Sequence, residues 1–179
     1  LKHGCILKFH NYIFFYYDKN KLWYSNGKYD RKTGLTYMCC NTDNDKENVS
    51  FACGCLMLIK TKMIMDIGML EDLFFLYSED TEYCCRAIDA GWKILWTSKS
   101  KIYHKISAST GENSDFQQYY LTRNNLILLK KYGNRRIYGY MKRLWCCLKD
   151  KLRGRCNLGP VWWAYVDFIK NKDGKTNRY

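Results

Sequence analysis

The stretch Phe74-Phe-Leu-Tyr-Ser-Glu-Asp-Thr-Glu-Tyr-Cys-Cys-Arg86 joins an apolar run to a polar helix start. Ser78 is of a residue type that commonly caps helices, and helical spacing then continues until Gly91, a residue type that commonly follows a helix end. The pattern therefore predicts a helix with Glu79 and Asp80 in its first turn. The helix dipole favours carboxylates at that position.

Asp80 shares one face of this expected helix with Tyr83, Cys84 and Ala87. That apolar face should turn inward, so the Asp80 carboxylate should point inward or into a cleft. A carboxylate in such a place can act as a general base. Ordinary helix capping also accounts for an acidic helix start, so both interpretations remain open at this point.

Elsewhere the chain alternates short apolar segments with helical ones. Strands are expected at Val49–Ile59, Trp92–Trp96 and Ile102–His104, a turn at Thr97–Lys101, and helices at Lys62–Ile67, Phe116–Tyr132 and Pro160–Ile169. Gly54 interrupts the first of these strands, and a glycine there suggests a bulge or the close approach of a ligand. The order of elements indicates a mixed α/β protein.

The ten cysteines include the pairs 39–40, 53–55, 84–85 and 146–147, with no C-x-x-C spacing. Vicinal cysteines rarely pair with each other and do not match zinc-site spacing. The pattern favours buried, reduced thiols in a reducing compartment.

Positive charge is concentrated in the C-terminal part of the chain. Residues 1–112 contain 15 Lys and Arg against 13 Asp and Glu, whereas residues 113–179 contain 15 against 4. Such a bias points to an anionic partner, either a membrane surface or nucleic acid. With 179 residues and 47% hydrophobic content, the chain can form one sizeable domain, and it has no apolar run near 18 residues.

The segment 133–179 is predicted to form a basic helical tail. Its apolar residues recur at spacings of three and four, at Ile137, Tyr140, Met141, Leu144, Trp145, Leu148 and Leu152. Basic residues occupy positions between them, at Arg136, Lys142, Arg143, Lys149, Arg153 and Arg155. A basic amphipathic helix with aromatic residues fits a membrane interface. Packing of the same helix on its own domain is the alternative.

The ordered set of motifs resembles the second half of family 2 glycosyltransferases, particularly the rhamnosyltransferase-like bacterial group. The motifs are Cys53-Gly54-Cys55 with its apolar continuation, Ile67-Gly68, Phe74–Tyr77, Glu79-Asp80, Arg86, Ala90-Gly91, Tyr103-His104 and Tyr120-Leu-Thr-Arg-Asn124. The resemblance implies the C-terminal part of a GT-A α/β domain over residues 1–132, followed by the basic tail.

The resemblance also implies a chemistry: inverting transfer of a sugar from a nucleotide-sugar donor to a glycan or lipid-linked acceptor in cell-surface polysaccharide synthesis. Asp80 would be the base and Glu79 would orient the acceptor. Gly54 would line the donor-sugar pocket, and Arg123 would lie near the phosphates or the acceptor. A divalent cation, Mn²⁺ or Mg²⁺, would take His104 as one ligand, an assignment that competes with a structural histidine.

The family's Asp-x-Asp metal motif is expected upstream of Leu1, so the chain is expected to be a fragment that lacks the nucleotide-binding half. Asp43-Asn44-Asp45 matches the Asp-x-Asp pattern, but no aliphatic strand precedes it in the sequence. The implied location is the cytoplasm, at the inner face of the cell membrane. The competing hypothesis is a non-enzymatic basic module that binds anionic membrane or nucleic acid, although no nucleic-acid motif is present.

Overall fold

In the computed structural model, residues 6–40, 46–47, 49–106, 111 and 114–178 are described. The strands are β1 (Ile6–Phe15), β2 (Leu22–Tyr24), β3 (Asn26–Asp30), β4 (Leu35–Cys39), β5 (Lys46–Glu47) and β6 (Lys93–His104). The helices are α1 (Thr61–Ile67), the 3-10 turn η1 (Asp72–Phe74), α2 (Glu79–Asp89), α3 (Asp115–Tyr132), α4 (Arg136–Leu152) and α5 (Leu158–Ile169). The mixed α/β class expected from the sequence is confirmed at this coarse level.

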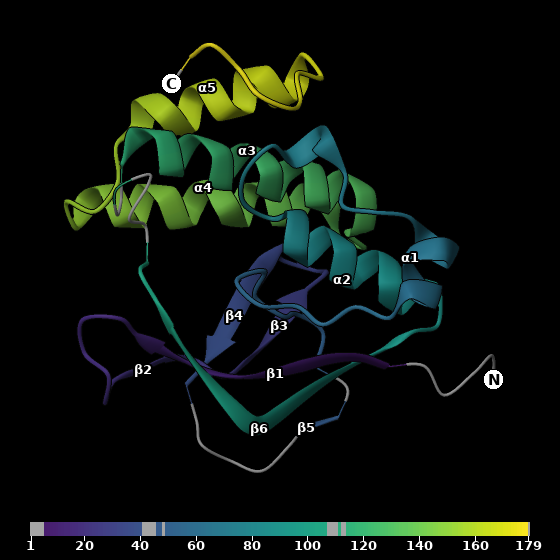
Figure 1. Cartoon of the computed structure of the whole chain (residues 1–179). Coiled ribbons are helices and arrows are strands. Elements are labelled where there is room, and N and C mark those ends of the chain that lie inside the picture. The colour runs from purple at the N-terminus through teal and green to yellow at the C-terminus, as the bar shows by residue number, and fades with distance from the viewer. Residues whose placement is uncertain (1–5, 41–45, 48, 107–110, 112–113, 179) are drawn as a thin grey trace. The chain divides into compact units, whose positions relative to one another are not determined.

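Two small sheets are formed. One has the order β2-β1-β6-β5, and the other pairs β3 with β4. The central strands β1 and β6 pair in parallel, and their register shifts between His10 and Tyr12; Figure 1 shows the bend in β6. The flanking pairs β1–β2 and β5–β6 are antiparallel.

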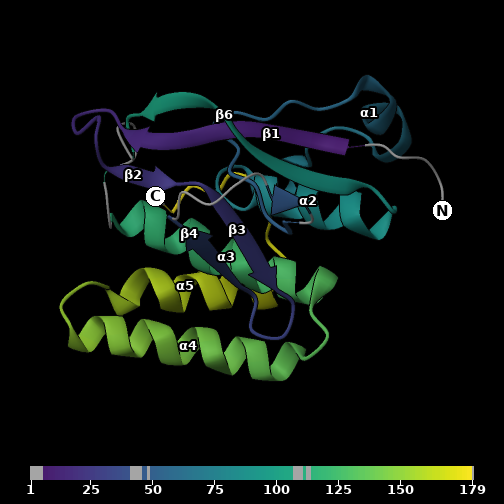
Figure 2. The same ribbon diagram turned by 90° about the horizontal axis from the view of Figure 1, so that it is seen from below.

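The chain divides into two compact units. The first comprises residues 1–29, 36–70 and 80–106, and the second comprises residues 30–35, 71–79 and 107–179. The second unit takes in α3 as well as the basic tail, and the domain boundary expected after residue 132 stays a prediction. Within the second unit α3, α4 and α5 run alongside one another, as Figures 1 and 2 both show.

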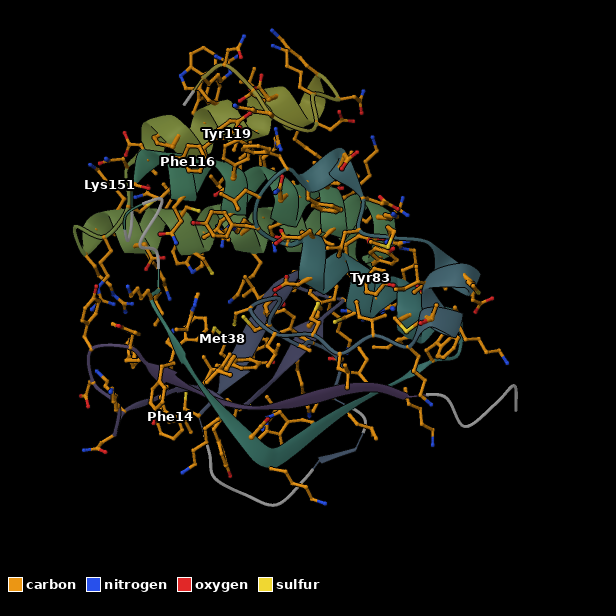
Figure 3. All side chains as sticks on the ribbon, in the orientation of Figure 1. Phe14, Met38, Tyr83, Phe116, Tyr119 and Lys151 are labelled. Atoms are coloured by element: carbon orange, nitrogen blue, oxygen red, sulfur yellow. The ribbon has the colours of Figure 1, made fainter. Side chains whose placement is uncertain are left out.

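The core of the first unit forms between α2 and the β6 strand. Tyr83, Cys84 and Ala87 of α2 are buried together with Ile94 and Trp96 of β6. Figure 3 labels Tyr83 on α2. The predicted inward face of this helix is therefore confirmed.

The predicted end of α2 is confirmed by its hydrogen bonds. The Gly91 N–H donates to the carbonyl of Ile88 at 2.9 Å, and the Trp92 N–H donates to that of Ala87 at 2.9 Å. Gly91 has φ of 86°. This is the Schellman arrangement, in which a left-handed residue after the helix satisfies its last carbonyls.

Two local predictions are wrong. Residues 49–59 do not form a strand: Phe51 makes an isolated bridge with Gly27, and the chain then turns at Gly54 and Cys55. The turn expected at Thr97–Lys101 is instead part of β6, whose pairing with β1 continues on both sides of the register shift, at Thr97 and at Lys101. The helices expected near residues 62, 116 and 160 are confirmed within two residues of their starts.

The second unit is held together by a helical core. Tyr119 and Tyr120 of α3 pack with Ala164 of α5, and Phe116 packs against them. Figure 3 shows Phe116 and Tyr119 at this contact between α3 and α5. The Tyr119 hydroxyl donates to Asp167 Oδ2 of α5 at 2.8 Å, which anchors the two helices to each other.

Candidate functional site

Asp80 lies in the first turn of α2, and its carboxylate accepts hydrogen bonds from two backbone amides. The Gly54 N–H donates to Asp80 Oδ2 at 2.9 Å. The Thr81 N–H donates to Oδ1 at 2.6 Å, and the Thr81 hydroxyl lies 3.3 Å from the same oxygen. Two residues that the sequence proposed separately, Gly54 and Asp80, are thus brought into direct contact within the first unit.

Gly54 approaches Asp80 so closely because it has no side chain. A Cβ built at this glycine would lie 3.3 Å from Asp80 Cβ and 3.4 Å from Oδ2. Such contacts are tight, so a larger residue would push the turn away from the carboxylate. The close approach to Asp80 is therefore a local structural reason for glycine at position 54, in addition to the donor-pocket role implied by the resemblance.

The surroundings of Asp80 raise the pKa of its carboxyl. Burial is the main cause, and the hydrogen bonds from the Gly54 and Thr81 amides act in the opposite direction. Burial disfavours the charged form, whereas N–H donors favour it. A raised pKa brings the group closer to neutral pH, where a general base works best.

The loop before α2 has an unusual backbone. Phe75, Tyr77 and Ser78 have φ values of 57°, 67° and 72°, although none is glycine. Non-glycine residues with positive φ are uncommon, and they cluster at functional sites. Ser78 was predicted to cap α2, but N-cap residues are normally extended, whereas Ser78 has a φ of 72°.

Asn124 holds this loop in place, a role that the sequence did not assign. Its amide nitrogen lies 2.8 Å from the carbonyl oxygens of Phe74 and Leu76 and 2.7 Å from that of Tyr77. All of these residues belong to the second unit. The sequence signal that could have identified Asn124 is its polar character on the buried face of a helix. The same position also belongs to the Tyr-x-x-Arg-Asn motif.

Arg123 is fully buried beside Asn124. Its guanidinium carbon lies 5.5 Å and 4.9 Å from the ring centroids of Tyr119 and Tyr120. Nε and Nη2 donate to Asn124 Oδ1 at 3.1 Å and 3.0 Å, while Nη1 is buried with no hydrogen-bond partner among the described residues. Arg123 therefore orients Asn124. Its predicted contact with a substrate stays a prediction.

Glu79 is the first residue of α2 and is partly buried. It groups with the second unit, whereas Asp80 groups with the first. The predicted role of Glu79 in orienting an acceptor stays a prediction.

His104 is the last residue of β6. Its carbonyl accepts a hydrogen bond from the Tyr16 N–H at 3.1 Å, and its ring centroid lies 5.2 Å from that of Trp23. Burial lowers the pKa of His104, which favours the neutral imidazole that metals bind. Its ring makes no hydrogen bond to Asp80 in the part of the chain that is described.

The predicted cation site is not assembled by the described residues. Over these ranges, no group of three His, Cys, Asp or Glu side chains is arranged to hold a metal ion. His104 is one chemically suitable ligand but not a complete set. Asp43 and Asp45, the other acidic candidates, fall outside the described residues.

The cysteines differ from the prediction in their exposure. Cys84, Cys85 and Cys147 are buried, but Cys40 and Cys55 are exposed. The nine cysteines in the described ranges form no disulfide with one another.

Comparison of the chain with protein-family models, with curated proteins and with solved structures finds no match in any of the three.

Proposed function

We propose that this chain is the acceptor-side part of an inverting glycosyltransferase in which Asp80 is the general base. The observation that carries the proposal is the Asp80 carboxylate itself. It lies at a helix start, accepts a hydrogen bond from the Gly54 amide at 2.9 Å, and has a raised pKa because of burial. The order of motifs around it, from Gly54 to Asn124, supports the same class of enzyme.

In this proposal Asp80 takes the proton of the acceptor hydroxyl. The acceptor oxygen then bonds to the anomeric carbon of the donor sugar from the face opposite the diphosphate. The bond from that carbon to the diphosphate oxygen breaks, and the nucleoside diphosphate leaves with the electron pair. Attack from the opposite face inverts the anomeric configuration. The proposal is tested by sugar transfer from a nucleotide-sugar donor in the full-length protein.

The proposal keeps Glu79 as an orienting residue and Arg123 as a residue near the substrate. The geometry adds Asn124 as a positioning residue, because it fixes the loop that leads directly into Glu79 and Asp80. A divalent cation, when bound, would neutralise charge on the diphosphate leaving group. His104 would supply one of its ligands.

The role of His104 leads to a test based on metal dependence. In a His104→Ala variant of the full-length protein, we expect lower sugar transfer that added Mn²⁺ partly restores, because only one ligand is lost. The measurement is the rate of transfer across a Mn²⁺ titration. A rate that is reduced equally at every Mn²⁺ concentration would assign His104 a structural role, and an unchanged rate would remove it from the site altogether.

An exposed surface on α4 supports a second property, peripheral binding to anionic membrane. Its apolar residues form the α4 stripe, which consists of Ile137, Met141, Leu144, Trp145, Leu148 and Leu152. The exposed fractions of these side chains range from 39% at Leu148 to 88% at Leu152. These side chains are therefore available for contact with a partner.

The opposite face of α4 is the one that packs within the second unit. Gly139 and Cys147 are buried there. The Tyr140 carbonyl accepts a hydrogen bond from the Tyr165 hydroxyl of α5 at 2.7 Å, and Arg143 Nη2 donates to Thr122 Oγ1 of α3 at 3.1 Å. Arg143, which the sequence placed on the basic surface, is therefore directed toward α3.

Basic side chains remain beside the α4 stripe. Lys149 Nζ lies 5.4 Å from the Trp145 ring centroid, and Arg136, Arg153 and Arg155 are exposed. Each basic residue near an anionic bilayer contributes about 1 kcal/mol. Among the described residues no helix is long and apolar enough to cross a bilayer. The combination suits a helix that lies at the membrane surface.

The membrane property predicts co-sedimentation with anionic liposomes at low salt. A Trp145→Ser variant should bind more weakly, because the stripe loses apolar contact with the bilayer. It should unfold at nearly the wild-type urea concentration, since Trp145 is 54% exposed. Met65→Ser on α1 is the matched control, because Met65 is 82% exposed but is not part of the stripe.

The same comparison separates the membrane from nucleic acid as partner. Both bind in a salt-sensitive way, but nucleic-acid binding would not respond to Trp145→Ser. A wild-type protein that ignores anionic liposomes at low salt would contradict the membrane proposal.

A further inference from the structure

The turn Cys53-Gly54-Cys55 places two thiols in contact next to Asp80. The two Sγ atoms are 3.1 Å apart. Cys55 is exposed and Cys53 is partly buried. The glycine between them is the residue whose N–H donates to Asp80 Oδ2 at 2.9 Å. The turn thus contains an accessible sulfur, a partly buried sulfur and, between them, a backbone amide held by Asp80.

The two thiols are not equivalent chemically. The hydrogen bond between the two thiols lowers the pKa of Cys55. The same hydrogen bond, followed by burial, raises the pKa of Cys53. The thiolate is the reactive form of cysteine, and accessibility decides which thiolate reacts. Cys55 is therefore the cysteine that attacks the disulfide substrate first, and Cys53 is the cysteine that reacts in the second step.

We propose that Cys53 and Cys55 form a thiol–disulfide exchange site that reacts with low-molecular-weight disulfides of the glutathione type. The argument for this site does not rest on the proposed glycosyl transfer. The Cys55 thiolate, having released its proton to solvent, attacks one sulfur of the small disulfide. The disulfide bond breaks, and the other half leaves as a thiolate that takes up a proton.

The second step forms the disulfide between the two cysteines. Cys53 attacks Cys55 Sγ in the mixed disulfide and forms the Cys53–Cys55 bond. The second small thiol leaves and takes the Cys53 proton. In sum, two protein thiols lose two electrons and two protons, and the small disulfide becomes two thiols. The small disulfide is the only oxidant required.

The geometry requires little movement for this bond. A disulfide has S–S of about 2.05 Å, so the two sulfurs need to approach by about 1 Å. Gly54 gives the turn the backbone freedom to allow this. Closure would also reorient the Gly54 amide, which now donates to Asp80. Oxidation is therefore expected to weaken that hydrogen bond.

The test is peptide mapping of the full-length protein after exposure to mixtures of glutathione and glutathione disulfide. Trypsin cleaves after Lys46 and Lys60, so the peptide 47–60 carries Cys53 and Cys55 and no other cysteine. After acid quench and alkylation, we expect an unalkylated form of this peptide that lacks two hydrogens. Its share should rise with the proportion of glutathione disulfide and fall to zero with dithiothreitol.

Two variants assign the roles of the thiols. Cys53→Ser should stop at a glutathione adduct on Cys55, and Cys55→Ser should prevent formation of the bond. At pH 7, Cys55 of the folded wild type should be alkylated at least about tenfold faster than Cys40, an exposed thiol with a carbonyl partner. Urea should remove this difference, because the Cys53 hydrogen bond exists only in the folded chain.

A wild-type peptide 47–60 that stays doubly alkylated at every glutathione ratio would overturn the proposal. So would equal alkylation rates of Cys55 and Cys40 in the folded protein. Both readouts are independent of sugar transfer, and the wild-type measurements do not depend on any variant folding.

Discussion

Replacing Asp80 by asparagine is expected to lower the turnover of sugar transfer by about 10²–10⁴-fold, the usual cost of removing a general base. The amide keeps the size of the carboxyl group but cannot accept the acceptor proton. The KM for the nucleotide sugar should change little, because Asp80 acts on the acceptor. The measurement is nucleoside diphosphate release by the full-length protein under saturating donor.

Asp89→Asn is the matched control, since Asp89 is an exposed acidic residue at the other end of α2. It should leave turnover close to the wild-type value. A second check uses pH. The base has to be ionised, and burial raises the pKa of Asp80, so activity should rise with pH through an inflection above the ordinary aspartate value of about 3.9. Near-wild-type turnover in Asp80→Asn would remove Asp80 as the base.

The largest loss of stability is expected from changes at Asn124. Asn124→Ala removes the donor to the carbonyls of Phe74, Leu76 and Tyr77 and the acceptor for Arg123. Leaving buried polar groups unsatisfied costs about 1–3 kcal/mol each. The free energy of unfolding should therefore fall by about 3 kcal/mol or more. Urea unfolding followed by fluorescence measures this change.

Asn124→Asp separates the two sides of the network. The carboxylate can still accept from Arg123, but it cannot donate to the loop carbonyls. If holding the loop is the main role of Asn124, the aspartate variant should be destabilised much as the alanine variant is. Leu121→Ala, at a partly exposed position of α3, is the control and should lower stability by less, about 1 kcal/mol. A nearly wild-type stability in Asn124→Asp would refute the loop-holding role.

The elements that were predicted correctly are those with local signals. The spacing of Tyr83, Cys84 and Ala87 fixes the buried face of α2, and Gly91 fixes its end through a hydrogen-bond pattern confined to neighbouring residues. Similarly, Ser114 accepts a hydrogen bond from the Gln117 N–H at 3.2 Å and begins α3 close to the predicted start. Such signals are contained in a few consecutive residues, so the sequence alone displays them.

The wrong predictions involve partners that are distant in the sequence. Thr97–Lys101 looks like a turn because it is polar, yet it is part of β6, and its two ends pair with His10 and Tyr12 of β1. Gly27 of β3 also depends on distant neighbours. A Cβ there would come within 2.6 Å of the Phe51 ring and 2.9 Å of the Tyr37 carbonyl, so glycine is needed for packing. Neither neighbour can be identified from the local pattern.

The sequence was sufficient to predict residues of the candidate site, but it did not show which of them contact one another. The resemblance named Gly54 and Asp80, but their hydrogen bond joins residues 26 positions apart. The motif around Arg123 suggested an arginine near the phosphates or the acceptor, and that contact stays a prediction. The motif did not reveal that Arg123 packs against two tyrosines or that Asn124 holds the loop. The Cys53–Cys55 contact was missed because a C-x-C spacing does not reveal which thiol is exposed.

The most direct test of the proposed function is a donor screen with the full-length wild-type protein. It is incubated with a panel of nucleotide sugars with and without Mn²⁺, and the released nucleoside diphosphate is measured. The proposal predicts release from a particular nucleotide sugar, stimulated by Mn²⁺ and lost in Asp80→Asn. Absence of release from every nucleotide sugar in the panel, or release that Asp80→Asn leaves unchanged, would contradict it.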